Sequence, residues 1–213
     1  MSSFQEYLRF FVTLTAVLDP FLAVPIFLTL TASHSARARV VLVRVVAVTV
    51  FIVLAVSALL GDTLLTLVGA SLAAFRVGGG LVLLLMALAM LNAQAGGVRQ
   101  SEEEAAELES GELRGVVPLA VPLLAGPGAI STTIIAAEKG GGSAAHLAAI
   151  IGCIALVSVL TWIVLRAADA IGGRLGTTGL NIATRLLGLL LAAIAIETMA
   201  DGLKVLFPGL TSA

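Results

Sequence analysis

The sequence is poor in charge, in aromatic side chains and in cysteine. Of its 213 residues, 12% are charged, 5% are aromatic and one, Cys153, is a cysteine. A single cysteine excludes a disulfide framework. A net charge of −1 without a Lys/Arg cluster argues against a nucleic-acid partner. Because 59% of the residues are hydrophobic, the chain exposes too much apolar surface for a water-soluble fold of this size, and we expect lipid to solvate it.

Signatures of enzymes and metal sites are also missing from the sequence. It has no His-Glu-x-x-His motif, and its two histidines, His34 and His146, stand far apart near the ends of apolar runs. A serine hydrolase buried in the membrane would therefore lack a base. The run Gly140-Gly141-Gly142 lacks the Lys-Ser/Thr ending of a phosphate-binding loop. We expect neither an enzyme nor a bound metal or cofactor.

Long apolar runs are what the sequence does contain. Their lengths predict an all-α membrane protein, a single transmembrane domain over residues 1–213. The six predicted helices span residues 6–31, 39–61, 69–93, 115–137, 144–167 and 182–206. Only the acidic segment 96–114 is polar enough to be a genuine loop, and we interpret it as a linker between residues 6–93 and 115–206.

Basic residues are shared unequally between the two sides of these helices. The positive-inside rule then places the loops after the first, third and fifth helices in the cytoplasm. Both termini would lie outside, on the periplasmic side of the inner (plasma) membrane. The predicted cytoplasmic side carries Arg37, Arg39, Arg44, Arg99, Arg114, Arg166, Arg174 and Arg185, and the other side carries Arg9, Arg76, Lys139 and Lys204.

Two short patterns occur twice at nearly the same spacing. Ala74-x-Arg76-x-x-Gly79 returns 109 residues later as Ala183-x-Arg185-x-x-Gly188, and Pro20 is followed by Pro127 after 107 residues. The third and sixth helices, and the first and fourth, are therefore predicted to be cognate. Because each half has three spans, an odd number, the second half must enter the membrane from the opposite side. Such inverted-topology repeats are typical of secondary transporters.

Prolines are concentrated in the first and fourth predicted helices, at positions 20, 25, 118, 122 and 127. Each removes a backbone donor and clashes with the preceding turn, so we expect both helices to be broken. Unpaired backbone is costly in hydrocarbon, which favours a position around an internal cavity. Half-helices starting near Pro20 and Pro127 would present positive ends to a carboxylate, and unwound carbonyls suit an ammonium group or a cation. The alternative is that the prolines only kink the helices for packing.

These features predict a substrate site with two sides. One side comprises Asp19, Pro20 and Pro25, where Asp19 would bind an ammonium group or carry a coupling proton, or would serve only as an N-cap. We predict a gating or coupling role for three charged residues, with snorkelling or interfacial positions as the alternatives. The other side of the site comprises Gly126, Pro127, Gly128, Ser131 and Thr132. The three charged residues with a predicted gating or coupling role are Arg76, Arg185 and Glu197.

The same motifs resemble those of the MarC family of bacterial and archaeal inner-membrane proteins, in order along essentially the whole chain. The resemblance implies six transmembrane helices, periplasmic termini, a charged cytoplasmic loop and kinship with neutral amino-acid transporters that move glycine and alanine. Where relatives commonly have glycine after the first Asn/Asp-Pro, this chain has Phe21-Leu22-Ala23, which predicts a narrower cavity. The motifs are Asp19-Pro20-x-x-x-x-Pro25, Arg76-x-x-Gly79-Gly80, Pro118-Leu119-Ala120-x-Pro122-x-x-x-Gly126-Pro127-Gly128 and Arg185-x-x-Gly188.

Together these observations predict a secondary transporter of small neutral amino acids, coupled to protons or sodium, with the lipid bilayer, the solute and a coupling cation as its partners. Two other classes stay open at this point. A metabolite exporter or channel would show flux without ion coupling, and a non-transporting membrane scaffold would show no stabilisation by a solute.

Overall fold

The computed structural model describes residues 3–31, 34–92 and 124–211, and within these ranges every element is a helix. The first predicted span is formed by α1 (Ser3–Leu18) and α2 (Pro20–Leu30). The remaining elements are α3 (Ala36–Val68), α4 (Leu72–Leu91), α7 (Pro127–Glu138), α8 (Ala144–Arg166), α9 (Ala168–Leu206) and the short 3-10 helix η3 (Pro208–Thr211).

Five candidate membrane spans lie within the described residues. They agree with five of the six predicted helices and run over Phe4–Leu28, Ala36–Gly61, Leu72–Leu91, Ala144–Arg166 and Thr178–Leu206. Of the remaining prediction, residues 115–137, only the part from residue 124 onwards is described, and it contains α7. The acidic linker at 96–114 lies outside the described residues. The chain is thus a multi-pass all-α membrane protein.

Serine caps mark the starts of three long helices. Ser35, Ser71 and Ser143 are each extended, and each side chain accepts a hydrogen bond from the backbone N–H three residues ahead. This is the N-cap arrangement, which satisfies one of the amide groups that a helix start leaves without a partner. The serines follow loops at the membrane boundary and therefore define where each span enters the bilayer.

Two predicted boundaries are wrong. We expected the second helix to end at residue 61, but α3 continues to Val68, where Gly69 ends it in the left-handed conformation with φ 73°. We also expected a loop before residue 182, whereas α9 begins at Ala168 and changes direction at Gly176, where φ is 60°. In both places a glycine that adopts positive φ decides where the helix bends or ends, as glycine does without steric cost.

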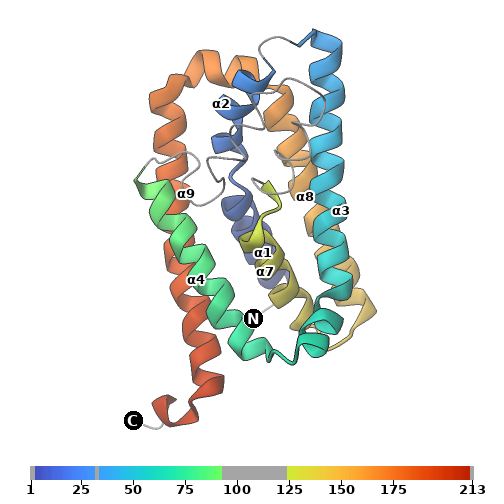
Figure 1. The fold of residues 1–213 in the computed structure, drawn as a ribbon, viewed down its shortest axis with the longest axis vertical. Coiled ribbons are helices and arrows are strands. Elements are labelled where there is room, and N and C mark those ends of the chain that lie inside the picture. Colours follow the sequence, from blue (N-terminus) through green and yellow to red (C-terminus); the bar gives the residue numbers. More distant parts are fainter. Residues whose placement is uncertain (1–2, 32–33, 93–123, 212–213) are drawn as a thin grey trace.

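The helices run up and down between two ends of the bundle (Figure 1). We call the end that carries Ser3, the turn at 69–71, the turn at 139–143 and Leu206 the terminal face, and the other end the opposite face. The two short helices have corresponding neighbours. α2 packs against α8 and α9, and α7 packs against α3 and α4.

The most extensive helix contact joins α4 to α9 in an antiparallel seam. Glycines allow the backbones to approach closely, as small residues do between membrane helices. A Cβ added at Gly80 would lie 3.0 Å from the Ala195 carbonyl oxygen, and one added at Gly202 would lie 2.7 Å from that of Ala73. A Cβ added at Gly188 would lie 3.2 Å from the Ala87 carbonyl oxygen.

Candidate functional site

The first span is interrupted between Leu18 and Pro20. Asp19 has φ 41°, the only positive φ of a non-glycine residue in the described chain. Its side chain is fully buried, and its Oδ1 accepts a hydrogen bond of 3.2 Å from the Leu22 backbone N–H. This carboxylate therefore caps the start of α2. The predicted break at Pro20 and the N-cap use of Asp19 are both confirmed.

The second predicted break falls at the start of α7, and the part of the fourth predicted helix before residue 124 lies outside the described residues. Gly126 is extended (φ −71°, ψ −179°), Pro127 occupies the first helical turn, and no side chain caps this start by a hydrogen bond. Proline suits the position because the amide it lacks would have no partner there. A Cβ on Gly128 would lie 2.6 Å from the Met86 sulfur, so glycine is what allows α7 to approach α4.

Hydroxyl side chains follow this start into the protein. Ser131, Thr132 and Thr133 are all buried, and Thr132 Oγ1 donates a 2.8 Å hydrogen bond to the Gly128 carbonyl oxygen. Thr133 Oγ1 is enclosed and has no hydrogen-bond partner among the described residues. Ser131 lies against α4, since a Cβ added at Gly79 would come within 2.9 Å of its Cβ. This turn of α7 is therefore polar although it is enclosed by the bundle.

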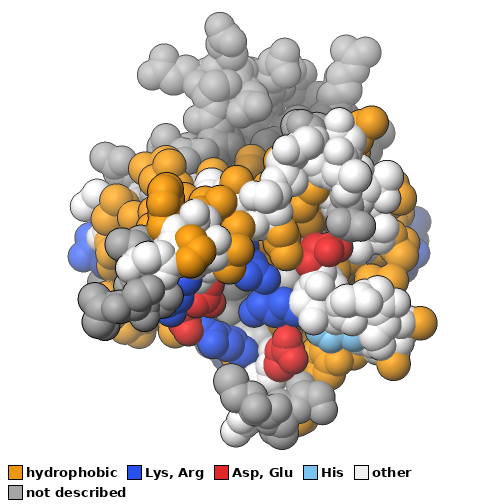
Figure 2. Space-filling view, turned by 90° about the horizontal axis from the view of Figure 1, so that it is seen from below, with side chains coloured by type: hydrophobic (Ala, Val, Ile, Leu, Met, Phe, Trp, Pro, Cys, Tyr) orange, Lys and Arg blue, Asp and Glu red, His pale blue; other side chains and the backbone are white. Residues whose placement is uncertain are grey.

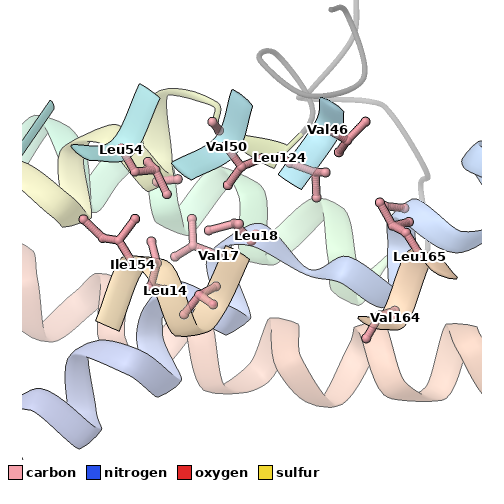
Figure 3. Close-up of a cluster of buried hydrophobic side chains, with 14 of the residues drawn as sticks. Leu14, Val17, Leu18, Val46, Val50, Leu54, Leu124, Ile154, Val164 and Leu165 are labelled. Carbon is pink, nitrogen blue, oxygen red and sulfur yellow. The ribbon is translucent and has the colours of Figure 1, made fainter. Parts of the chain in front are cut away.

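Apolar side chains occupy the space beside both breaks. Leu18 precedes the first break and Leu124 precedes Gly126, and both are buried in one cluster with residues of α1, α3 and α8. Figure 3 shows Leu14, Leu18 and Leu124 in this cluster together with Val50 and Leu54 of α3 and Ile154 of α8. The two predicted sides of the substrate site thus border the same apolar cluster.

A hollow of about 100 Å³ opens on the terminal face. Thr132 and Leu83 lie on its inner wall, and acidic and basic side chains surround it (Figure 2). Across it, the Arg9 guanidinium of α1 forms an ion pair with the Glu197 carboxylate of α9. Glu197 was predicted from its helical spacing to Asp201. The other charged residues of the lining are Glu6, Lys139 and Asp201.

A second hollow, of about 350 Å³, opens on the opposite face. It reaches Phe27 of α2, and its lining includes His34 and Arg166. Arg39 of α3 crosses it. Its Nη1 lies 3.2 Å from Asp169 Oδ1 at the start of α9, and its Nε donates a 3.0 Å hydrogen bond to the Thr31 carbonyl oxygen. Arg39 therefore connects the end of α2 with the starts of α3 and α9.

The end of α7 has a similar connection on the terminal face. His146 Nε2 lies 2.9 Å from the Ala136 carbonyl oxygen, and its Nδ1 lies 3.1 Å from the Tyr7 hydroxyl. Because a carbonyl oxygen can only accept, Nε2 donates this hydrogen bond. This side chain joins α7, α8 and α1.

Of the predicted site residues, only Thr132 and Glu197 line one of the two hollows; Asp19, Pro20, Gly126, Pro127, Gly128 and Ser131 line neither. Three further predicted residues also lie away from both hollows. Pro25 is half-buried within α2. Arg76 is half-buried on α4 against Gly202, and Arg185 is exposed on α9. Neither arginine is among the lining residues of the two hollows described above. The sequence analysis used Arg9 and Arg39 only to orient the helices and did not predict them as site residues. The signal that could have identified them is their position within a turn or two of the end of a span.

Large apolar side chains cover the outside of the bundle as well as its core. On α3, for example, Val41, Val45, Val48 and Ile52 are exposed at helical spacing, and α9 exposes Ile182, Leu186 and Leu189. Such a surface is stable only in contact with lipid. With five candidate spans, these surfaces define a polytopic helical protein of the lipid bilayer.

Comparison with known proteins identifies the family. Residues 4–207 match the family described as MarC family integral membrane proteins, and the chain belongs to this family. It is 39% identical over 207 residues to the UPF0056 membrane protein YhcE of Escherichia coli, which covers 97% of this chain and 96% of that protein. The resemblance inferred from the motifs is thereby confirmed.

Relatives extend to Gram-positive bacteria and archaea. The UPF0056 membrane protein YvbG of Bacillus subtilis is 36% identical over 98% of this chain and 99% of its own length. A UPF0056 membrane protein of Methanocaldococcus jannaschii is 32% identical over 94% and 97%. These names describe membrane proteins and state neither an enzymatic activity nor a substrate. No solved structure matches the chain.

Proposed function

We propose that this protein is an inner-membrane secondary transporter of small neutral amino acids, coupled to protons or sodium and built from two inverted halves, residues 6–93 and 115–206. The observation that carries the proposal is that the interruption of the first span and the helix start at Pro127 border one buried cluster, with one hollow on the terminal face and one on the opposite face. Alternating access needs a central barrier with an approach from each face.

Local structure at corresponding positions supports the repeat. Helices begin at Pro20 and Pro127, and serines cap helices at Ser35 and Ser143. Gly69 and Gly176 both have positive φ. The serine pair and the glycine pair were both absent from the motifs that first suggested the repeat. The offsets between the members of each pair are 107, 108 and 107 residues.

Packing supports the repeat in the same way. Under this correspondence α2 is equivalent to α7, α3 to α8, and α4 to the main part of α9. The neighbours of α2 are α8 and α9, and the two most extensive contacts of α7 are with the equivalent helices α3 and α4, although α7 also packs against α1 and α8. Arg39 and His146 are also equivalent by offset, and each binds a carbonyl oxygen at or near the end of the short helix that precedes it.

The chemistry at the breaks supports a zwitterionic solute. The Asp19 carboxylate already caps α2, so this side of the site suits an ammonium group or a cation. The start of α7 has no side-chain cap, so its amide groups suit a carboxylate. The buried hydroxyls at Ser131 and Thr132 add polar contacts for a small solute, which agrees with the resemblance to transporters of glycine and alanine.

Counterflow in proteoliposomes tests the proposal. Vesicles containing purified protein and loaded with unlabelled alanine should accumulate labelled glycine, alanine or serine transiently, and a proton or sodium gradient should change the net uptake. Absence of counterflow for all three would overturn the amino-acid assignment. Non-saturable flux independent of both gradients would favour the channel or exporter alternative instead.

A further inference from the structure

We infer that Arg9–Glu197 and Arg39–Asp169 are two ion-pair gates, one on each face, which close the approach to the centre of the protein alternately. The inference deepens the proposed transport function and rests on it. It arises from the position of the two pairs, because each crosses a hollow and joins α9 to a different helix.

On the terminal face, Arg9 and Glu197 join α1 to α9 above the wall that contains Thr132. Separation of these two side chains would widen the passage between the helices towards the start of α7. The same hollow also contains Glu6, Lys139 and Asp201, so each partner of the pair has an alternative ion partner nearby once the pair opens.

On the opposite face, Arg39 joins α3 to α9 through Asp169 and holds the end of α2 through the Thr31 carbonyl oxygen. Movement of α2 away from α9 would therefore have to break this connection. His34 and Arg166 are the other charged or titratable residues of that hollow. The inner wall here is Phe27, which is 3% exposed.

The two pairs involve opposite ends of one helix. Asp169 is in the first turn of α9, and Glu197 lies nine residues before its end at Leu206. Both pairs are intact in this conformation, in which the apolar cluster is closed. Because α9 bends at Gly176, between the two pairs, a tilt of the segment after the bend relative to α1 would separate Arg9 from Glu197 while Arg39 stays paired with Asp169, which is the behaviour that alternating access requires.

Side-specific cysteine labelling tests this inference without any solute. Because Cys153 is the only cysteine, Cys153→Ser provides a background in which Thr132→Cys reports the terminal hollow and Phe27→Cys the opposite one. Membrane-impermeant maleimide is applied to vesicles of each orientation. The gates are opened one at a time by the near-isosteric changes Glu197→Gln and Asp169→Asn, which remove a charge and keep the side-chain shape.

We expect Glu197→Gln to raise the labelling rate of Thr132→Cys about two- to five-fold, the range that an exposed ion pair supports, and to lower that of Phe27→Cys. Asp169→Asn should do the reverse. The exchange Arg9→Glu with Glu197→Arg should return both rates towards their starting values. No change, or an increase at both sites, would overturn the inference, since the latter indicates looser packing rather than a shift between two states.

Lys204→Gln is the matched control. Lys204 pairs with Asp201 at 3.5 Å on the same face, but both residues belong to α9, so their separation opens nothing between helices. An effect as large as that of Glu197→Gln would overturn the inference, because surface charge alone would then explain the result. Reciprocal labelling without amino-acid counterflow would preserve the gates and reject the solute. Counterflow without reciprocal labelling would reject only the gates.

Discussion

The Asp19 carboxylate caps the start of α2, whereas the start of α7 is formed by Gly126 and Pro127 and has no side-chain cap. The two helix starts thus differ in their electrostatics. The Asp19 carboxylate lies at the positive end of α2, whereas no side chain balances the positive end of α7, which keeps its attraction for an anion. Under the proposed function, the two starts would provide two unlike sides for one solute, an anionic side and a cationic one.

The largest effect is expected where the second break approaches its neighbour. Gly128→Leu should abolish transport, because its Cβ would lie 2.6 Å from the Met86 sulfur and 3.1 Å from Leu83 Cδ2 and would displace α7 from α4. Counterflow measures the activity, and size-exclusion chromatography in detergent checks the fold. Gly78→Leu is the control, since nothing lies within 4 Å of a Cβ there. Normal transport by the Gly128 variant would reject this position as part of the site.

The second change separates the two uses of Asp19. Asp19→Asn keeps an N-cap and tolerates positive φ, so we expect a stable protein that has lost its transport activity. Asp19→Ala should also lose about 1 kcal/mol of stability from the missing cap. Thermal unfolding in detergent and counterflow would measure the two effects. Wild-type counterflow in the Asn variant would show that the charge has no role in transport.

The third change makes the two breaks alike. Gly126→Asp would place a carboxylate at the start of α7, where φ of −71° allows any residue, and should reduce the apparent affinity for the solute carboxylate about ten-fold or more, the consequence of losing one charge-assisted contact. Gly126→Ala adds only the Cβ and serves as the control. Equal effects of Asp and Ala on the concentration dependence of counterflow would mean that space, not charge, matters at this position.

The smallest effect is expected from the hydroxyl layer of α7. Thr132→Val removes the hydroxyl group that faces the terminal hollow and should weaken solute affinity about two- to five-fold, as the loss of one neutral hydrogen bond does. Thr161→Val is matched to it, because Thr161 is also buried and donates to the carbonyl oxygen four residues earlier, 3.0 Å away in α8. Equal affinities in the two variants would exclude Thr132 from solute contact.

Local chemistry determined how much of this structure the sequence could predict. The break at Pro20, the helix start at Pro127 and the N-cap at Asp19 follow from the covalent properties of proline and from capping, and these features agree with the structure. The extension of α3 to Val68 and the early start of α9 depend on which glycines adopt positive φ. Composition does not distinguish Gly69 and Gly176 from glycines that remain helical.

The partners of charged residues were harder to predict, because pairing is a property of the packed helices. Glu197 was identified from its spacing to Asp201, but its partner Arg9 is 188 positions away in the chain. Arg39 and Asp169 are separated by 130 positions. Hydropathy places such residues near a membrane boundary and gives no information about the helix they face, so Arg76 and Arg185 were proposed on the strength of their repeat instead.

The glycine seam between α4 and α9 limits the kinds of movement that the protein can make. At Gly80, Gly188 and Gly202 a backbone carbonyl oxygen of the partner helix occupies the place of a side chain. The side chains of Met199 and Val77 also lie directly against Gly80 and Gly202, so sliding along the helix axes would press them against the facing helix, whereas rolling about the line of contact leaves the glycines in register. Because α4 and α9 come from different halves of the chain, a rotation of one half relative to the other would take place about this line of contact.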